Sequence, residues 1–184
     1  MQLGEELRDP PVDGVSSLVF APDNDSILVT SWDKTIRIYD VASNTLQRKF
    51  TEGAPVLDGC YQDPLTILAG GLEKIIKRFD LNNGSSEDIG RHDAPVRCVQ
   101  HCKDTGLIIS GSWDATVRCW DPRTSPMAPI CSLPQGAKVF SMTQSGHRLV
   151  VATAHRNINI YDKRMLRLAP DPEQSRESSL KYQT

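Results

Sequence analysis

Three polar residues in the middle of the chain have the composition of a hydrolase triad. His92, Ser110 and Asp114 supply an imidazole, a hydroxyl and a carboxylate. In such a triad the serine is the nucleophile, and it must lie exposed beside an oxyanion hole. Ser110 instead sits inside the apolar run IISG at 108–111. The pattern therefore favours a structural hydroxyl, and we do not expect the protein to be an enzyme.

A second cluster, formed by Cys98, His101 and Cys102, contains the side chains that bind zinc. A structural zinc site needs four ligands, usually as two tight pairs, and no second pair is present. We therefore predict no metal and no other cofactor. The cysteines are expected to be free thiols that pack as small apolar side chains; there are five of them, at Cys60, Cys98, Cys102, Cys119 and Cys131.

The composition is that of an ordinary globular protein. The 184 residues are 39% hydrophobic and 24% charged, with a formal net charge of −2. This balance predicts no direct binding to nucleic acid. No apolar run is long enough to span a membrane, and the N-terminus MQLGEELRDPP lacks the apolar region of a signal peptide. We therefore expect an intracellular protein with no membrane partner.

The chain repeats itself with a period of about forty residues. The segments SWDKTIRIYD, LEKIIKRFD, SWDATVRCWD and AHRNINIYD each end in an aromatic residue followed by aspartate. Those aspartates are 40, 41 and 41 residues apart, at Asp40, Asp80, Asp121 and Asp162. Repeats of this length indicate an architecture in which each unit stacks on its neighbours.

Each unit has the same predicted order of elements. An opening turn leads into a short strand from Val15, Val56, Val96 or Val139. Compact apolar runs follow at 27–30, 67–70, 108–111 and 149–152, then a tight turn and an alternating strand. A less regular fourth strand is clearest at 45–50, and no amphipathic helix is evident. Four short strands in 40 to 45 residues are typical of one propeller blade.

These units resemble WD repeats, with the third unit the fullest match. That resemblance implies a hydrogen-bonded tetrad of a loop His, a strand Ser, a turn Asp and a strand Trp, here His92, Ser110, Asp114 and Trp120. A buried Trp N–H needs an acceptor, which gives such a tetrad a physical reason. The His position reads Pro11, Glu52 and Gln135 in the other units. We expect those blades to depend more on apolar packing.

Longer strings resemble one subfamily. PPVDGVSSLVFAPD, SWDKTIRIYDV, HDAPVRCV, SGSWDATVRCWDPRT and RESSLKYQT are similar to the mitotic checkpoint propellers of the "budding uninhibited by benzimidazoles" family. That resemblance implies a non-enzymatic scaffold, which binds Glu-containing segments of checkpoint kinases on one face of the propeller and reads phosphothreonine motifs of a kinetochore scaffold. It implies a nuclear protein, on kinetochores in mitosis and also cytoplasmic. A related mRNA-export propeller that docks on a nucleoporin is the nearest alternative.

The expected fold is an all-β, partial WD-repeat β-propeller of about four four-stranded blades, where the family fold has seven. We assign residues 1–11 to an N-terminal, ring-closing strand without its partner blade, 12–168 to the four blades, and 169–184 to a polar loop and the start of an absent fifth blade. RMLRLAPDPEQ, near the end, departs from the repeat and predicts a polar loop. An open ring would expose apolar faces, so we expect a chain that is unstable, oligomeric or prone to aggregate.

The tight turns carry the candidate binding residues. Trp32 and Trp113 precede the turn aspartates; each either covers its turn or anchors a partner peptide, because Trp is frequent at interface hot spots. Basic residues predicted near the same face, which could meet a phosphothreonine, are Lys34, Arg91, Lys138 and Arg156. The family resemblance implies that part of the phosphate-reading surface lies in blades beyond residue 184, so we expect this chain to bind phosphothreonine peptides weakly.

A third reading rests on two short boxes. Trp120-Asp121-Pro122-Arg123 and Tyr161-Asp162-Lys163-Arg164 resemble the Trp-Asp-x-Arg box of cullin ubiquitin-ligase substrate receptors. The box is short and recurs in many WD repeats. Arg123 could equally pair with a nearby carboxylate or lie over an aromatic ring.

Overall fold

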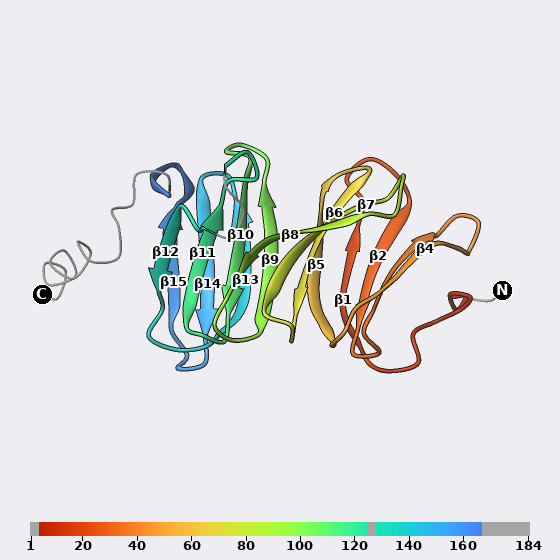
Figure 1. Ribbon diagram of the computed structural model, residues 1–184, viewed down its shortest axis with the longest axis horizontal. Helices are drawn as coiled ribbons and strands as arrows, with labels where there is room; N and C mark the ends of the chain where they lie inside the picture. Colours follow the sequence, from red (N-terminus) through yellow and green to blue (C-terminus); the bar gives the residue numbers. More distant parts are fainter. Residues whose placement is uncertain (1–3, 125–127, 167–184) are drawn as a thin grey trace, which may run out of the picture.

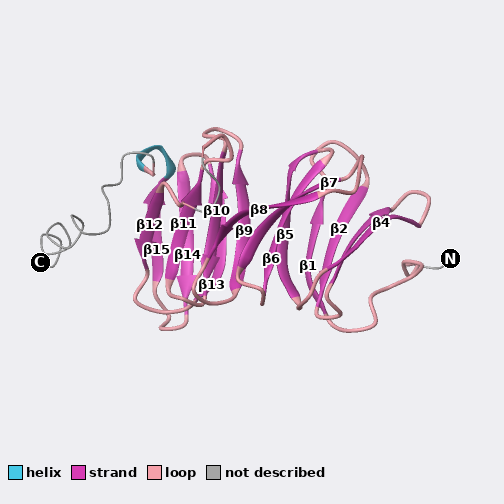
Figure 2. Ribbon diagram, viewed as in Figure 1, coloured by secondary structure: helices cyan, strands magenta, loops and turns pink. Residues whose placement is uncertain are grey.

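The structure is a computed structural model and describes residues 4–124 and 128–166. It is all-β, as the sequence predicts, and its strands form four antiparallel sheets arranged side by side (Figure 1; Figure 2). The sheets of the first two blades occupy the right half of Figure 1 and those of the last two the left half. The described part of the chain contains no helix long and apolar enough to cross a membrane.

Each sheet is one contiguous stretch of sequence. Blade one contains β1 (Val15–Phe20), β2 (Ser26–Ser31), β3 (Thr35–Asp40) and β4 (Thr45–Thr51). Blade two contains β5 (Val56–Asp63), β6 (Thr66–Gly71), β7 (Ile75–Asp80) and β8 (Ser86–Arg91). Blade three contains β9 (Val96–Cys102), β10 (Leu107–Ser112), β11 (Thr116–Trp120) and β12 (Cys131–Pro134). Blade four contains β13 (Val139–Ser145), β14 (Arg148–Thr153) and β15 (Ile158–Asp162), followed by the 3-10 turn η1 (Lys163–Met165).

The fourth blade departs from the predicted four strands. Its sheet has three strands among the described residues, and the predicted polar loop and start of a fifth blade at 169–184 lie outside them. Residues 163–166 also differ from the predicted polar loop. Lys163 is buried and donates from Nζ to Gln144 Oε1 at 2.9 Å, and Leu166 is buried in the core of blades three and four.

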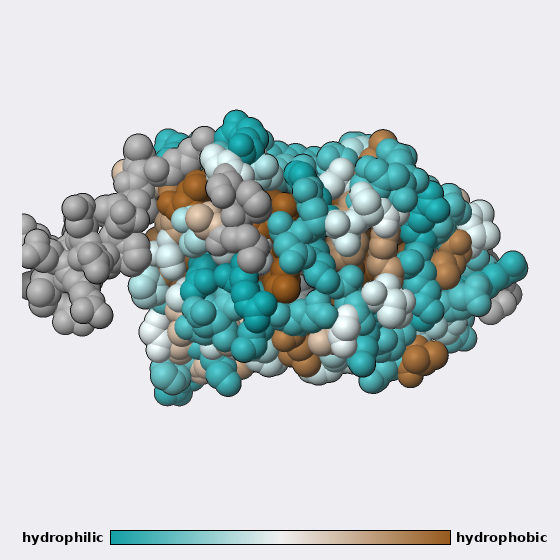
Figure 3. Space-filling model, in the orientation of Figure 1, coloured by the Kyte–Doolittle hydropathy of each residue, from teal (hydrophilic) through white to brown (hydrophobic). Residues whose placement is uncertain are grey.

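The core consists of separate apolar layers between consecutive sheets. Leu28 and Ile36 of blade one pack against Ile67 of blade two, and Leu68 of blade two packs with Ile108 of blade three. The middle strands are therefore buried on both faces, which explains why their sequences read as continuous apolar runs. The visible surface is mainly hydrophilic with separate hydrophobic patches (Figure 3).

The aromatic residue that ends each repeat points toward the preceding blade. Phe79 lies in the layer between blades one and two, and Trp120 in the layer between blades two and three. Tyr161 packs against the layer between blades three and four. Tyr39, in the first blade, packs with Leu7 of the N-terminal segment.

The N-terminal segment differs from the predicted unpaired strand. Its described part, residues 4–11, forms no strand and is bound to blade one. Asn44 accepts from Arg8 N at 2.9 Å and donates to Glu6 O at 3.0 Å, and Tyr39 Oη donates to Asp9 O at 2.7 Å. In each later blade, one face packs against the preceding blade. In blade one, the N-terminal segment covers part of the corresponding face.

Candidate functional site: the turn-bearing edge of the blades

All four blades present one tight turn along the same edge, the lower edge in Figure 1. We call this the turn edge; it consists of the turns between β2 and β3, β6 and β7, β10 and β11, and β14 and β15. The third residue of each turn is Asp33, Glu73, Asp114 or His155, and we call the three carboxylates the turn acids. The residue that follows has a positive φ between 64° and 69°, at Lys34, Lys74, Ala115 and Arg156. In blade one, Lys34 N donates to Ser31 O at 3.3 Å, and the other turns close in the same way.

Blade three anchors its turn through the predicted tetrad. His92 Nδ1–H donates to Asp114 Oδ2, with 2.7 Å between the atoms, and His92 Nε2 lies 2.7 Å from Ser110 Oγ. Trp120 Nε1–H donates to the same Ser110 Oγ at 2.8 Å. One continuous hydrogen-bonded chain thus runs from Trp120 through Ser110 and His92 to Asp114.

The tetrad is structural because no reactant can reach it. Ser110 is fully buried, and His92 and Trp120 are each only 1% exposed. Its hydroxyl accepts from the indole and pairs with the imidazole, which leaves no open side for an attack on substrate. The triad-like distances therefore serve to satisfy buried polar atoms.

Asp114 carries the charge of this network. It accepts from Thr116 N at 2.9 Å, from Thr116 Oγ1 at 2.6 Å and from Asp93 N at 3.1 Å. Burial raises the pKa of Asp114, but hydrogen bonds from His92 and Thr116 and the charge of His92 together outweigh it, and the pKa lies well below its usual range. The aspartate is thus held ionised at the base of the turn.

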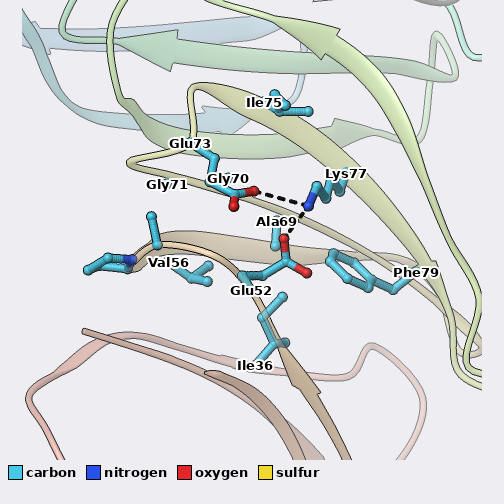
Figure 4. Close-up of a pocket in the computed structure, with 12 residues that line it drawn as sticks. Ile36, Glu52, Val56, Ala69, Gly70, Gly71, Glu73, Ile75, Lys77 and Phe79 are labelled. Atoms are coloured by element: carbon cyan, nitrogen blue, oxygen red, sulfur yellow. Dashed lines mark hydrogen bonds and ion pairs between the residues drawn. The ribbon is translucent and has the colours of Figure 1, made fainter. Parts of the chain in front are cut away.

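The other blades lack the tetrad and have different polar networks beside their apolar layers, which sequence reasoning did not predict. In blade two, Lys77 forms ion pairs with Glu52 and with Glu73, the latter at 3.0 Å (Figure 4). Phe79 takes the place of the tryptophan, so no buried N–H needs a serine. A cavity of about 20 Å³ beside the pair is large enough for one water molecule and too small for a side chain.

Blades one and four show two further solutions. In blade one, Arg37 pairs with Asp33 at 3.1 Å and donates to Asp9 O at 2.8 Å. In blade four, Gln135 takes the histidine position. Its Nε2 donates to Tyr161 Oη at 2.9 Å, and its Oε1 accepts from Asn159. Sequence reasoning missed these partners. Their signal was the residue four positions after the turn acid, which is basic at Arg37, Lys77 and Arg118.

Trp32 and Trp113 occupy the second residue of equivalent turns. The backbone N–H at this position always donates to the carbonyl just before the inner strand: Trp32 to Gly14 O at 2.9 Å and Trp113 to Pro95 O at 3.0 Å. Leu72 and Ala154 make the same backbone bond in blades two and four, at 2.9 Å each. Because the turn forms equally with leucine or alanine, its backbone does not require tryptophan.

The two indoles differ in exposure. Trp32 is 42% exposed, whereas Trp113 is half-buried and its Nε1 is buried with no hydrogen-bond partner among the described residues. Lys138 Nζ lies 5.8 Å from the centroid of the Trp113 ring, within cation–π range. Lys34 and Arg156 are exposed in the turns of blades one and four, and Arg91 is exposed at the end of β8. Trp32, Lys34, Trp113 and Arg156 lie in the turns of the turn edge, and Arg91 and Lys138 lie where one blade leads into the next.

Both Trp-Asp-x-Arg boxes lie at the opposite edge, and their arginines fold back on the nearest carboxylate. Arg123 Nε and Nη2 donate to Asp121 at 2.8 and 2.7 Å, and Arg164 pairs with Asp162 in the same way. The cluster of Cys98, His101 and Cys102 offers no centre: no group of three or more metal-binding side chains is found in the described part of the chain.

The order of the sheets, the repeated turns and the tetrad define a WD-repeat protein with the blades of a β-propeller. Residues 6–40 and 86–121 match the family model "WD domain, G-beta repeat". Along nearly its whole length, the chain is similar to mitotic checkpoint proteins with WD repeats, and the resemblance found in the sequence is confirmed.

Several curated relatives carry checkpoint names. The chain is 47% identical to mitotic checkpoint protein BUB3.1 of Arabidopsis thaliana, over 98% of its own length and 53% of the relative's. It is 37% identical to mitotic checkpoint protein bub3 of Dictyostelium discoideum, over 97% of its length and 54% of the relative's. A poly(A)+ RNA export protein of Schizosaccharomyces pombe is 32% identical, over 97% and 52%. The chain thus spans about half the length of the curated relatives it matches.

A solved structure supports the fold independently. The computationally designed Ika4 protein superposes with a TM-score of 0.70, covering 87% of this chain and 99% of that one. At 16% identity, this likeness concerns the fold alone.

Proposed function

We propose that the chain acts in a non-enzymatic scaffold of the mitotic spindle checkpoint, where it binds a Glu-rich peptide segment of checkpoint kinases along the turn edge. Such binding would help to recruit the kinases to kinetochores, with the protein nuclear, kinetochore-bound in mitosis and also cytoplasmic. The relationship to mitotic checkpoint proteins supports the process, and the turn edge supports the mode of binding.

The proposal rests on one observation: the turn of blade one does not need a tryptophan at position 32, and yet it has one. Leu72 and Ala154 close equivalent turns, yet blade one places a 42% exposed tryptophan there. An exposed indole gives up apolar area to water, and a partner peptide recovers that area by covering it. Lys34 beside it, and Lys138 over Trp113, supply positive charge for acidic side chains. Together with Arg91 and Arg156, they could also meet a phosphothreonine of the kinetochore scaffold.

Peptide titration tests this proposal. Trp32→Ala should weaken binding of a labelled Glu-rich kinase peptide by about tenfold or more, the effect of losing a hot-spot side chain. Val41→Ala is the matched control, because Val41 is 39% exposed but follows β3 at the opposite edge; it should bind normally. Unchanged affinity for Trp32→Ala with an intact circular dichroism spectrum would rule out this anchor, whereas a collapsed spectrum would make Trp32 structural.

The export relatives keep a second function open. Poly(A)+ RNA export protein of Schizosaccharomyces pombe and mRNA export factor GLE2 of Chaetomium thermophilum are 32% and 31% identical to the chain. Both readings use a peptide on the same edge, so the same titration with a nucleoporin segment decides between them. Tighter binding of the nucleoporin peptide would favour export over the checkpoint.

A further inference from the structure

Two cysteines of blade three face each other across neighbouring strands. Cys119 in β11 and Cys131 in β12 are directly opposite in the antiparallel ladder. Both side chains point into the core between blades three and four, and both residues are buried. Each thiol shifts the pKa of the other, which is consistent with side chains that lie next to each other in this layer.

The backbone places this pair within reach of a covalent bridge. Directly opposed residues of antiparallel strands have Cα atoms about 4.5 to 5.5 Å apart, and disulfides span roughly 4.4 to 6.8 Å between Cα atoms. Cys131 begins β12, a strand of only four residues that pairs with β11 alone. Rotation of two side chains and a small shift of this short strand would therefore suffice.

We infer that Cys119 and Cys131 form a dithiol site that a peroxide oxidises reversibly to a disulfide. Cys131 loses its proton and its thiolate attacks one peroxide oxygen. The S–O bond forms, the O–O bond breaks, and the hydroxide that leaves takes up the proton lost by Cys131, so that a sulfenic acid and one water result. The Cys119 sulfur then attacks the Cys131 sulfur; the S–S bond forms, the S–O bond breaks, and hydroxide leaves as water with the Cys119 proton. Two thiols and one peroxide thus become one disulfide and two waters, and a thiol reductant reverses the change.

The surroundings distinguish the attacking thiol from its partner. The hydrogen bond from Cys119 lowers the pKa of Cys131, and the same bond raises that of Cys119. Cys131 is also the more accessible of the two, 6% exposed against 0% for Cys119, so we assign the attack on peroxide to its thiolate, the reactive form. Burial raises the pKa of Cys98 to about 12 and also raises that of Cys60, which makes both poor nucleophiles.

Cys102 is the competitor within the same apolar layer. Burial raises its pKa, but Thr105 and Lys163 lower it further, so that the net shift is downward. Cys102 is, however, fully buried and stands opposite Leu107 in the ladder, not opposite a thiol. Oxidation there would stop at a sulfenic acid with no cross-strand partner to resolve it.

Peptide mapping after oxidation tests the inference. The folded 184-residue chain is treated with hydrogen peroxide, alkylated in denaturant and digested. We expect a cross-linked peptide containing Cys119 and Cys131, two hydrogens lighter than the reduced pair and absent after a thiol reductant. Cys60 and Cys98 should be alkylated. Cys119→Ser should leave a sulfenic acid at Cys131 that dimedone traps, and Cys98→Ser, the control in the same core layer, should form the cross-link normally.

Other outcomes would overturn the inference. Complete alkylation of Cys119 and Cys131 after peroxide would show that the pair does not react, and a cross-link of either residue to Cys102 would show different chemistry. If the chain is first unfolded in denaturant and then oxidised, and the same cross-link forms to the same extent, the fold plays no part in the reaction. Each of these readouts uses the unmodified chain, so they hold even if a serine variant fails to fold.

Discussion

Replacing Ser110 with alanine should reveal how much the tetrad contributes to stability. The hydroxyl accepts from Trp120 Nε1 at 2.8 Å and pairs with His92 Nε2 at 2.7 Å, and both partners are only 1% exposed. Alanine therefore leaves two polar atoms buried and unpaired. Each such atom costs about 1 to 3 kcal/mol, so Ser110→Ala should lower the free energy of unfolding by roughly 2 to 6 kcal/mol.

The molecule supplies its own control for this loss. Blade two has Ala69 and Phe79 at the positions of Ser110 and Trp120, and both are buried without an unpaired N–H. Trp120→Phe alone should cost about 1 to 3 kcal/mol for the lost packing. In Ser110→Ala/Trp120→Phe, no indole N–H remains to be satisfied, so the double variant should lose at least about 1 kcal/mol less than the sum of the single losses.

Urea unfolding followed by tryptophan fluorescence and far-ultraviolet circular dichroism measures all three losses. Trp32 and Trp113 remain as fluorophores in Trp120→Phe. Strict additivity of the two substitutions would refute the view that Ser110 is needed for the indole N–H. A loss below about 0.5 kcal/mol for Ser110→Ala would refute the cost assigned to the two unpaired atoms.

Two further predictions concern the charged parts of the turn edge. The pKa values of Asp33 and Asp114 are both depressed in the fold: burial raises them, but hydrogen bonds, chiefly from Thr35 to Asp33 and from His92 to Asp114, lower them further. The stability that these two ionised carboxylates contribute should be complete above their unfolded pKa of about 4 and should be lost as the pH falls below it. Urea midpoints that stay constant from pH 5 to pH 2 would contradict this. Asp114→Asn should make the urea midpoint less dependent on pH. Lys77→Met leaves Glu52 and Glu73 facing each other and should cost about 1 to 3 kcal/mol; Glu52→Gln in that background should recover part of it, and no recovery in urea unfolding would mean that the two carboxylates do not interact.

The fold was predictable because equivalent strands recur at a nearly constant spacing in the sequence. Four aromatic-Asp endings, 40 or 41 residues apart, located the strands now seen as β3, β7, β11 and β15. The N-terminal segment was not predictable in the same way. The family resemblance predicts a strand there, but Leu7 packs on blade one, and Asn44 forms hydrogen bonds with the backbone of Arg8 and Glu6. Partners so distant along the chain leave no local pattern.

The candidate site was partly readable for a related reason. In blade three, the unusual combination of His, Ser, Asp and Trp identifies the tetrad from the sequence. The pairs Glu52 with Lys77 and Gln135 with Asn159 consist of residue types that are common on protein surfaces, so that only the folded structure shows that they interact. Blades two, three and four each place a polar side chain before the inner strand, at Glu52, His92 and Gln135, and each of these side chains finds a different partner.

The same comparison between blades shows which tryptophan could be free for function. Trp120 is fixed by the fold, since Gly90 lies so close beneath the indole that an added Cβ would stand 2.2 Å from the ring. Trp32 is constrained only through its backbone, because leucine and alanine close the same turn elsewhere. Selection for folding therefore accounts for Trp120 but not for Trp32. An exposed indole that the turn does not need is best explained by something it binds, and that is why the peptide titration should begin at Trp32.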